Sequence, residues 1–253
     1  MTAPAVAITG STTGIGYAIA EAFAHAGARL AINSHIADTA ALEKLSAITE
    51  CHFVEADIST VAGAQGFVAT AREKLGRLDT LVNNAGTFRD TEFDDLTEAV
   101  FSSTFNLNVK GYLFAAQAFV KQLTPDQDNP SIICVGSTNS LAAEKNSVVY
   151  DASKGAVLML IRSLAVTLAS RRIRVNGIGP GIVETPLTKA GLDTPGVRPA
   201  LERQIPLGRV GLPADIGGAA VFLASPAPRF ITGQMLYVDG GILANQMSWE
   251  PAT

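Results

Sequence analysis

Seven short runs of aliphatic and β-branched residues recur along the 253-residue chain, and longer segments with helical spacing separate them. Each run is bounded by Gly, Asp, Asn or Pro, a pattern typical of buried strands. The predicted strands are Val6–Thr9, Leu30–Asn33, His52–Ala56, Thr80–Val82, Ile132–Val135, Arg174–Ile178 and Leu236–Val238. Helical spacing is clear over Tyr17–His25, Asp94–Phe119 and Ser147–Ser170.

Strands that alternate with helix-length segments need crossover connections, and right-handed crossovers place helices on both faces of a parallel sheet. The order therefore predicts an α/β fold with a Rossmann-type, doubly wound parallel sheet. No linker or internal repeat marks a boundary in the sequence, so residues 1–253 are expected to form a single domain. Residues 184–212 are rich in Pro and Gly and are expected to form a mobile lid over a substrate site. Residues 242–253, with Trp249, form a tail that either lies on a neighbouring subunit or frays.

Composition limits the classes of partner. A net charge of -4 provides no basic field for nucleic acid, so that partner is excluded. The chain begins without a basic and apolar leader and has no long uninterrupted apolar stretch, so we expect no membrane partner and a cytoplasmic location. Cys51 and Cys134 lie in apolar runs and are expected to be unreactive, and no metal site is expected.

A glycine-rich loop follows the first predicted strand and precedes the first predicted helix. Glycines there let the backbone approach a pyrophosphate, while the helix N-terminus contributes free N–H groups and a positive dipole end. The loop therefore predicts a dinucleotide site that includes Gly10, Ser11, Thr12, Thr13, Gly14, Ile15 and Gly16.

A tyrosine and a lysine, Tyr150 and Lys154, are four residues apart at the start of a long predicted helix, so they share one face. Alcohol oxidation or carbonyl reduction needs a group that exchanges a proton with the substrate oxygen while hydride moves. A free tyrosine has a pKa of about 10, and a neighbouring cation is expected to lower that pKa and stabilise the tyrosinate. Ser137 ends the fifth predicted strand, where its hydroxyl can hold the reacting oxygen.

These motifs, taken in order along the chain, resemble those of the short-chain dehydrogenases/reductases. The resemblance runs from Val6 to about Gly241 and rests on the TGxxxGxG loop, NNAG at residues 83–86, YxxxK at 150–154 and PG at 180–181. It implies that Asn108, in an NxxG motif, anchors a water that links the lysine to solvent, and that Lys154 also holds the nicotinamide ribose. By the same resemblance, the remaining contacts with the dinucleotide come from Asp57, Ile58, Asn84, Ala85, Gly86, Tyr150, Pro180, Gly181, Val183 and Thr185.

The end of the second predicted strand bears on the choice of cofactor. Asn33, Ser34 and His35 stand there and are expected to contact the dinucleotide, but no carboxylate is present for the ribose 2′-hydroxyl of NAD. That absence favours NADP. No Arg or Lys stands at Thr12, Thr13, Ser34 or His35 to hold a 2′-phosphate, so NAD stays open.

The sequence thus predicts an NAD(P)-dependent oxidoreductase acting on a sugar, polyol, hydroxy acid or ketone. Residues 139–149 and the lid are expected to form its substrate pocket, and their polar and apolar side chains leave the compound open. A reductase of 3-oxoacyl groups on an acyl carrier and a non-catalytic dinucleotide sensor are the alternatives. Helix Ser147–Ser170 has too many apolar positions for one buried stripe, and together with the resemblance this predicts a homotetramer or homodimer.

Overall fold

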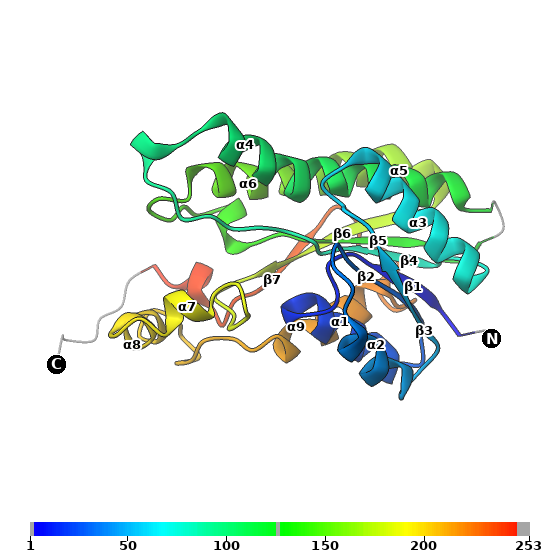
Figure 1. Cartoon of the computed structure of the whole chain (residues 1–253), viewed down its shortest axis with the longest axis horizontal. Helices are drawn as coiled ribbons and strands as arrows, with labels where there is room; N and C mark the ends of the chain where they lie inside the picture. The colour runs from blue at the N-terminus through cyan, green and yellow to red at the C-terminus, as the bar shows by residue number, and fades with distance from the viewer. Residues whose placement is uncertain (1–2, 125–126, 247–253) are drawn as a thin grey trace.

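Seven parallel strands form one sheet in the computed structural model, which describes residues 3–124 and 127–246 (Figure 1). Their order across the sheet is β3-β2-β1-β4-β5-β6-β7. The strands are β1 (Ala5–Ile8), β2 (Arg29–Ser34), β3 (Cys51–Glu55), β4 (Thr80–Asn83), β5 (Ser131–Val135), β6 (Arg174–Pro180) and β7 (Met235–Val238). The predicted doubly wound parallel sheet is confirmed, and each predicted strand overlaps an observed one.

Helices cover both faces of the sheet (Figure 1). One face carries α1 (Gly14–His25), α2 (Thr39–Ser46) and α9 (Ala214–Ala224). The other face carries α3 (Val61–Leu75), α4 (Glu98–Phe105), α5 (Gly111–Gln122) and α6 (Val148–Leu168). Two short helices, α7 (Lys189–Leu192) and α8 (Val197–Glu202), lie in the predicted lid.

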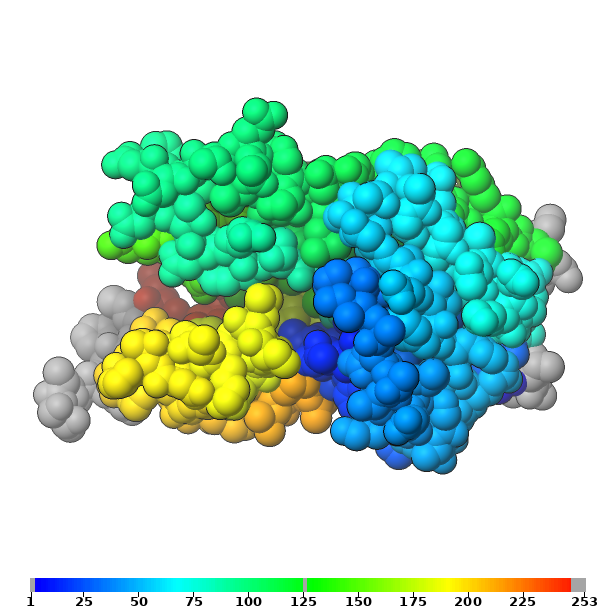
Figure 2. Space-filling view, in the orientation of Figure 1, coloured from blue at the N-terminus to red at the C-terminus, as the bar shows by residue number. Residues whose placement is uncertain are grey.

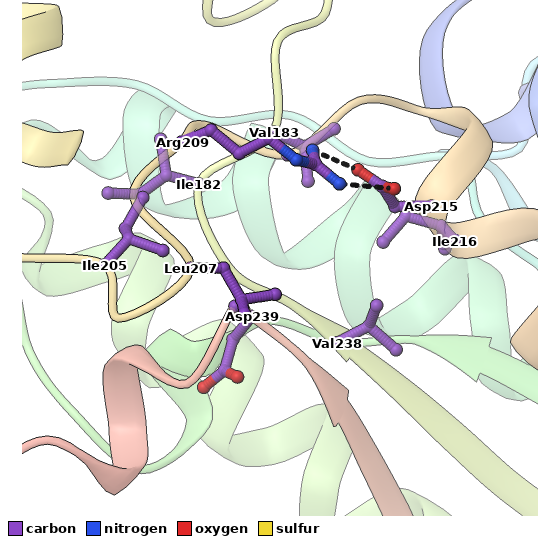
Figure 3. Close-up of a pocket in the computed structure, with 11 residues that line it drawn as sticks. Ile182, Val183, Ile205, Leu207, Arg209, Asp215, Ile216, Val238 and Asp239 are labelled. Carbon is purple, nitrogen blue, oxygen red and sulfur yellow. Dashed lines mark hydrogen bonds and ion pairs between the residues drawn. The ribbon is translucent and has the colours of Figure 1, made fainter.

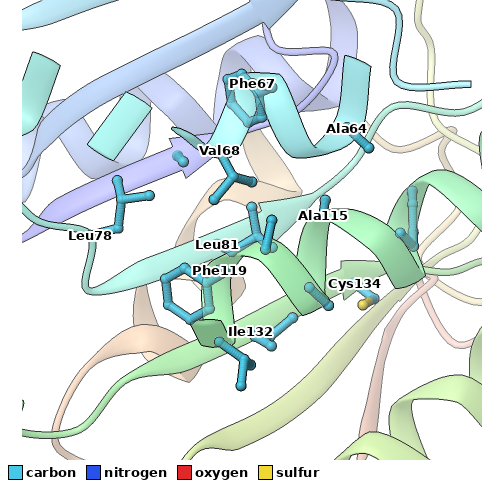
Figure 4. Packing of buried hydrophobic residues seen from close by; sticks show 14 of the residues in the cluster. Ala64, Phe67, Val68, Leu78, Leu81, Ala115, Phe119, Ile132 and Cys134 are labelled. Carbon is cyan, nitrogen blue, oxygen red and sulfur yellow. The ribbon is translucent and has the colours of Figure 1, made fainter. Parts of the chain in front are cut away.

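The aliphatic runs are continuous because both sides of each central strand are buried. Successive side chains of a strand point to opposite faces, so Leu81 packs beneath α3 and α5, whereas Val82 faces the α1 and α9 layer. Phe67 and Phe119 fill the space above β4 and β5 (Figure 4). Hydrophobic packing on the two faces of the sheet sets the distance between the helices and the strands. This packing also positions the loops at the carboxyl edge of the sheet.

The helix predicted over Asp94–Phe119 is interrupted. A 3-10 turn at Phe93–Asp95 precedes α4, and a π-helical turn at Asn106–Lys110 joins α4 to α5. The π turn inserts one extra residue, and Asn108 within it is completely buried. At its end, Gly111 lies against the carbonyl of Ile58, where a side chain would collide.

The predicted lid is a folded segment that contains α7 and α8. Its two ends meet in a parallel bridge between Val183 and Gly211. Arg198 pairs with Glu184 at 2.8 Å, and Lys189 pairs with Asp193 at 2.8 Å. Its mobility stays a prediction. The end of the predicted tail, with Trp249, lies outside the described residues.

Within the described residues, one helical segment, Val148–Arg171, is long and apolar enough to cross a membrane. This segment contains α6, which packs against β6 and buries Val157 and Ile161 in the core. It is therefore a structural helix of the domain.

Candidate active site

The order of the strands reverses between β1 and β4, and the helices that follow these two strands cover opposite faces of the sheet. Ligands bind in the crevice at such a switch point, outside the carboxyl ends of the strands. Figure 2 shows a hollow in the surface here, between the green segment around residues 90–110 and the yellow lid.

The glycine loop runs from β1 to α1 at the base of this hollow. Gly10 and Gly14 have φ values of +59° and +55°, a conformation that L side chains rarely adopt. A Cβ on Gly10 would also lie 2.8 Å from the Cα of Ala85. Thr13 is the N-cap of α1, and its side chain makes no capping hydrogen bond. The first turn of α1 therefore keeps N–H groups for an anionic ligand, and the cradle fits a pyrophosphate.

The loop after β4 is joined directly to the glycine loop. The side-chain amide of Asn84 donates to the carbonyls of Thr9 and Gly10, at 3.0 and 2.7 Å. In return, the Thr9 hydroxyl accepts from the backbone N–H groups of Asn84 and Ala85, at 2.9 and 3.0 Å. Thr9 is absent from the predicted site residues, although its position directly before the first glycine was a usable signal.

Two of the predicted cofactor contacts, Ser11 and Asn33, have buried side chains. The Ser11 hydroxyl accepts from the backbone N–H of Asn33 at 3.0 Å and donates to a β1 carbonyl at 2.8 Å. The Asn33 amide accepts from the N–H of Gly10 at 3.2 Å and donates to the carbonyl of Val54 at 3.0 Å. These side chains hold the loop to β2 and β3 from inside, whereas Ser34, at the end of β2, is only half-buried.

His35 and Asp57 lie near one another, after β2 and β3. Hydrogen bonds from Ser59 lower the pKa of Asp57, and the neighbouring His35 and Lys110 lower it further. Ile58 is buried beneath this edge. The structure therefore brings together the residues predicted to contact the adenosine end of a dinucleotide.

Tyr150 and Lys154 lie on one face in the first turns of α6, as their spacing predicted. The Lys154 ammonium is 5.5 Å from the centroid of the Tyr150 ring and donates to the carbonyl of Val135 at 3.1 Å. The same carbonyl accepts from the Tyr112 hydroxyl at 3.2 Å. Phe88 packs edge-on against Tyr150, with ring centroids 5.0 Å apart.

The expectation that Lys154 lowers the pKa of Tyr150 does not hold for this arrangement. Burial raises the pKa of Tyr150 to about 12, a hydrogen bond with Ser137 opposes the rise, and Glu144 and Asp151 add to it. Burial also lowers the pKa of Lys154 to about 8. Desolvation disfavours the charged form of each side chain, and it is the largest cause of both shifts.

Ser137 and Asn108 complete the group of predicted catalytic residues. Ser137 lies two residues after the end of β5 and is 7% exposed. Asn108 accepts from the N–H of Thr87 at 2.9 Å and donates to the carbonyl of Thr87 and to the Ser153 hydroxyl, at 3.1 and 3.0 Å. Both amide protons are thus used within the protein, so the side chain of Asn108 ties α6 to the loop after β4. The water anchor that the resemblance implies at Asn108 stays a prediction.

Gly86 links the cofactor loops to this group. A Cβ on Gly86 would lie 3.3 Å from the Asn108 amide oxygen and 3.8 Å from the Lys154 ammonium. The last residue of NNAG therefore lies between the glycine loop and the Tyr150–Lys154 pair.

The segment after β6 closes the other side of the glycine loop. A Cβ on Gly14 would lie 3.5 Å from the Cβ of Thr185. The Thr185 hydroxyl bonds to that of Thr188 at 3.1 Å, and Val183 is buried. Pro180 ends β6, and a Cβ on Gly181 would lie 2.8 Å from the Cα of Asp239, so the motif is packed against the turn after β7.

A pocket of about 210 Å³ lies beneath the base of the lid, between the ends of β6 and β7 (Figure 3). It contains none of the predicted catalytic residues. Asp215 forms two hydrogen bonds with Arg209, and the Asp239 carboxylate accepts from two backbone N–H groups. Both carboxylates in the pocket therefore already have hydrogen-bond partners within the protein, and we assign the pocket no ligand.

The switch-point crevice, the open helix N-terminus and the Ser137, Tyr150 and Lys154 group together define a dinucleotide-dependent oxidoreductase. Comparison with known proteins agrees. Residues 10–243 match a family described as enoyl-(acyl carrier protein) reductase. The L-rhamnose-1-dehydrogenase of Scheffersomyces stipitis is 36% identical over 95% of this chain and 96% of its own length.

Two solved structures resemble the whole chain. A gluconate 5-dehydrogenase from Burkholderia cenocepacia, in complex with NADP and tartrate, has a TM-score of 0.91 and 32% identity over 97% of each chain. A 3-oxoacyl-[acyl-carrier protein] reductase from Brucella melitensis, in complex with NAD, has a TM-score of 0.91 and 29% identity over 98% of this chain and 100% of its own. The chain belongs to the short-chain dehydrogenase/reductase family and is an NAD(P)-dependent enzyme that acts on CH–OH groups.

The glycine loop provides a first prediction. A side chain at Gly16 would meet the carbonyl of Gly10 and the amide of Asn84, so Gly16→Ala should destabilise the protein by roughly 1–3 kcal/mol and abolish dinucleotide binding. In Gly66→Ala, the matched control within α3, the added methyl meets nothing within 4 Å, so stability should rise by roughly 0.5–1 kcal/mol. Chemical denaturation and fluorescence titration with NADH and with NADPH measure both properties, and normal dinucleotide binding by Gly16→Ala would contradict the assignment.

Burial of Lys154 has a measurable cost. Its pKa falls from 10.5 to about 8 on folding, so between these values the unfolded chain binds more protons and stability rises with pH. Below pH 8 the folded state holds a desolvated charge, and Lys154→Met should be more stable than the wild type by about 3 kcal/mol. The difference should narrow as the pH rises from 8 to 10.5. Denaturation curves across this range test the claim, which a pH-independent difference would refute.

Proposed function

We propose that the protein oxidises one hydroxyl group of a neutral sugar, with NADP or NAD as hydride acceptor and Tyr150 as proton acceptor. The observation that carries this proposal is the placement of Tyr150, Lys154 and Ser137 beside the glycine loop, with Gly86 between them. The similarity to L-rhamnose-1-dehydrogenase supports a sugar as the substrate.

Oxidation of an alcohol removes a hydride from carbon and a proton from oxygen, and a bound nicotinamide supplies the hydride acceptor. In the proposed reaction the proton passes to the ionised Tyr150 oxygen, which becomes the neutral phenol, and the Ser137 hydroxyl holds the substrate oxygen in reach of it. Lys154 and Gly86 border the position proposed for the nicotinamide ribose. Thr185 lies across the glycine loop, at the position proposed for the carboxamide.

The charges of the lid favour a neutral substrate. Arg198 and Lys189 are both paired, with Glu184 and Asp193, so little of their positive charge is free to attract an acidic substrate or an acyl carrier. The facing loop carries Glu144 and the amide of Asn146, groups suited to sugar hydroxyls. The family description keeps a reductase of carrier-bound acyl groups as the second candidate, and a hydroxy acid, a ketone or a non-catalytic sensor is less well supported.

We also propose that the enzyme is a cytoplasmic homotetramer or homodimer. Met159 and Val166 on α6 are 56% and 81% exposed, and Phe101 on α4 and Leu113 on α5 are exposed as well. Large apolar side chains gathered on packed helices are typical of subunit interfaces. Light scattering on the purified protein measures the mass that tests this assembly.

The assay follows nicotinamide absorbance with each dinucleotide against L-rhamnose, other sugars, polyols, hydroxy acids, ketones and a 3-oxoacyl thioester. Turnover of a sugar supports the proposal, and turnover of the thioester alone favours the second candidate. Tyr150→Phe should bind dinucleotide normally and lose about 10²- to 10⁴-fold in kcat. Because burial raises the pKa of Tyr150, wild-type oxidation should accelerate with pH into the alkaline range, whereas the variant should not. Substantial activity in Tyr150→Phe would refute the mechanism.

Cofactor choice is tested at the end of β2. His35→Asp places an anion where we propose that a 2′-phosphate binds, so repulsion should weaken NADPH binding by about tenfold or more and leave NADH binding nearly unchanged. His52→Asp, in β3, makes the same change beside Glu50 and serves as the matched control. Calorimetry with both dinucleotides provides the affinities. Unchanged NADPH affinity in His35→Asp would remove His35 from the site.

A further inference from the structure

The Ser137 hydroxyl has two hydrogen bonds with one residue, Asn139. It accepts from the backbone N–H of Asn139 at 3.1 Å and lies 3.1 Å from the Asn139 side-chain amide oxygen. An amide oxygen has no proton to give, so Ser137 is the donor in this second contact. Two contacts with one residue thus fix the place of the Ser137 oxygen.

The orientation of the Asn139 amide is fixed by a carboxylate. Its nitrogen donates to Asp151 at 2.7 Å, and Asn139 is only 8% exposed. A carboxylate only accepts, so the nitrogen must face Asp151 and the oxygen must face Ser137. The opposite orientation would place an oxygen against the carboxylate and leave the amide protons without this acceptor.

Asp151 accepts hydrogen bonds from other groups in addition to Asn139. Its carboxylate also accepts from the Ser147 hydroxyl at 2.8 Å and from the backbone N–H of Glu144 at 3.2 Å. Asp151 directly follows Tyr150 in the first turn of α6. One carboxylate therefore joins the first turn of α6 to the turn that follows Ser137 and to the loop between them.

We propose that Asp151 and Asn139 are positioning residues that fix the place of the Ser137 hydroxyl beside Tyr150. With its oxygen held by Asn139, Ser137 can keep the substrate oxygen in reach of ionised Tyr150. This inference rests on the proposed oxidation of a hydroxyl group. Neither residue touches the reacting atoms in this scheme, because both act through Ser137.

The test measures kcat, at saturating dinucleotide, in the wild type and in a Ser137→Ala background. Asn139→Ala and Asp151→Ala should each lower kcat by roughly 10- to 100-fold in the wild type, since a misplaced catalytic group loses rate without losing the fold. In the Ser137→Ala background, either change should cost less than about threefold, because residues that act as one unit are not additive. Equal losses in both backgrounds, or no loss in the wild type, would overturn the proposal.

Asp79→Ala is the matched control. Asp79 also accepts several hydrogen bonds, from the N–H of Ala5 at 2.8 Å and from Arg77 at 3.0 Å, but it lies at the amino edge of the sheet. Its loss should lower Tm and leave kcat unchanged.

Crystal structures of Asp151→Ala and Asn139→Ala provide a readout without turnover. In Asp151→Ala, the Asn139 amide should reorient and the contact between Ser137 and the Asn139 amide oxygen should be lost. If that contact survives, the inference fails whatever the substrate is. If the wild type turns over none of the hydroxyl compounds in the assay, the proposed oxidation fails instead, and the contact in the variant still decides whether Asp151 positions Ser137.

Discussion

The close approach of two backbone loops at the switch point, after β1 and after β4, is the constraint on which the rest of the site depends. Residues 9–10 and residues 84–85 are joined by four hydrogen bonds across these loops, and a side chain on Gly10 or Gly16 would force the loops apart. The contact fixes where Gly86 lies, and Gly86 in turn lies against Asn108 and Lys154. The distance between the pyrophosphate cradle and the catalytic group is thus set by backbone packing, which tolerates little change.

Burial of the ionisable side chains in the catalytic group destabilises the folded protein. Lys154 and Tyr150 are desolvated, so folding favours the uncharged form of each. The Val135 carbonyl compensates in part by accepting from Lys154 and from Tyr112. Residues with pKa values displaced by burial in a cleft are typical of functional sites, because a purely structural position would carry an apolar side chain. The sheet supplies the rigid frame that holds these two groups in place.

The sequence predicts a structural feature correctly where residues close together in the chain determine that feature. The strands are visible because both faces of the sheet are buried, and the Tyr150–Lys154 spacing specifies a shared face on any helix. Prediction fails where contacts between residues far apart in the sequence determine the structure. The π turn at Asn106–Lys110 adds one residue to a helical pattern that stays apolar on average, and it ends where Gly111 meets Ile58. The pKa directions depend on burial, and the partners of Asp151 come from residues up to twelve positions away.

The choice between NADP and NAD at the end of β2 also depends on contacts that the local sequence does not show. A carboxylate at the end of β2 would bind a ribose 2′-hydroxyl and repel a phosphate, whereas an arginine would do the reverse. This chain has neither, and Asn33, the residue before the last one of the strand, uses its amide to hold the glycine loop and β3. Its side chain therefore has a structural role. Ser34 and His35, the other two residues predicted to contact this end of the dinucleotide, provide neither a carboxylate nor an arginine, so both dinucleotides are compatible with this edge.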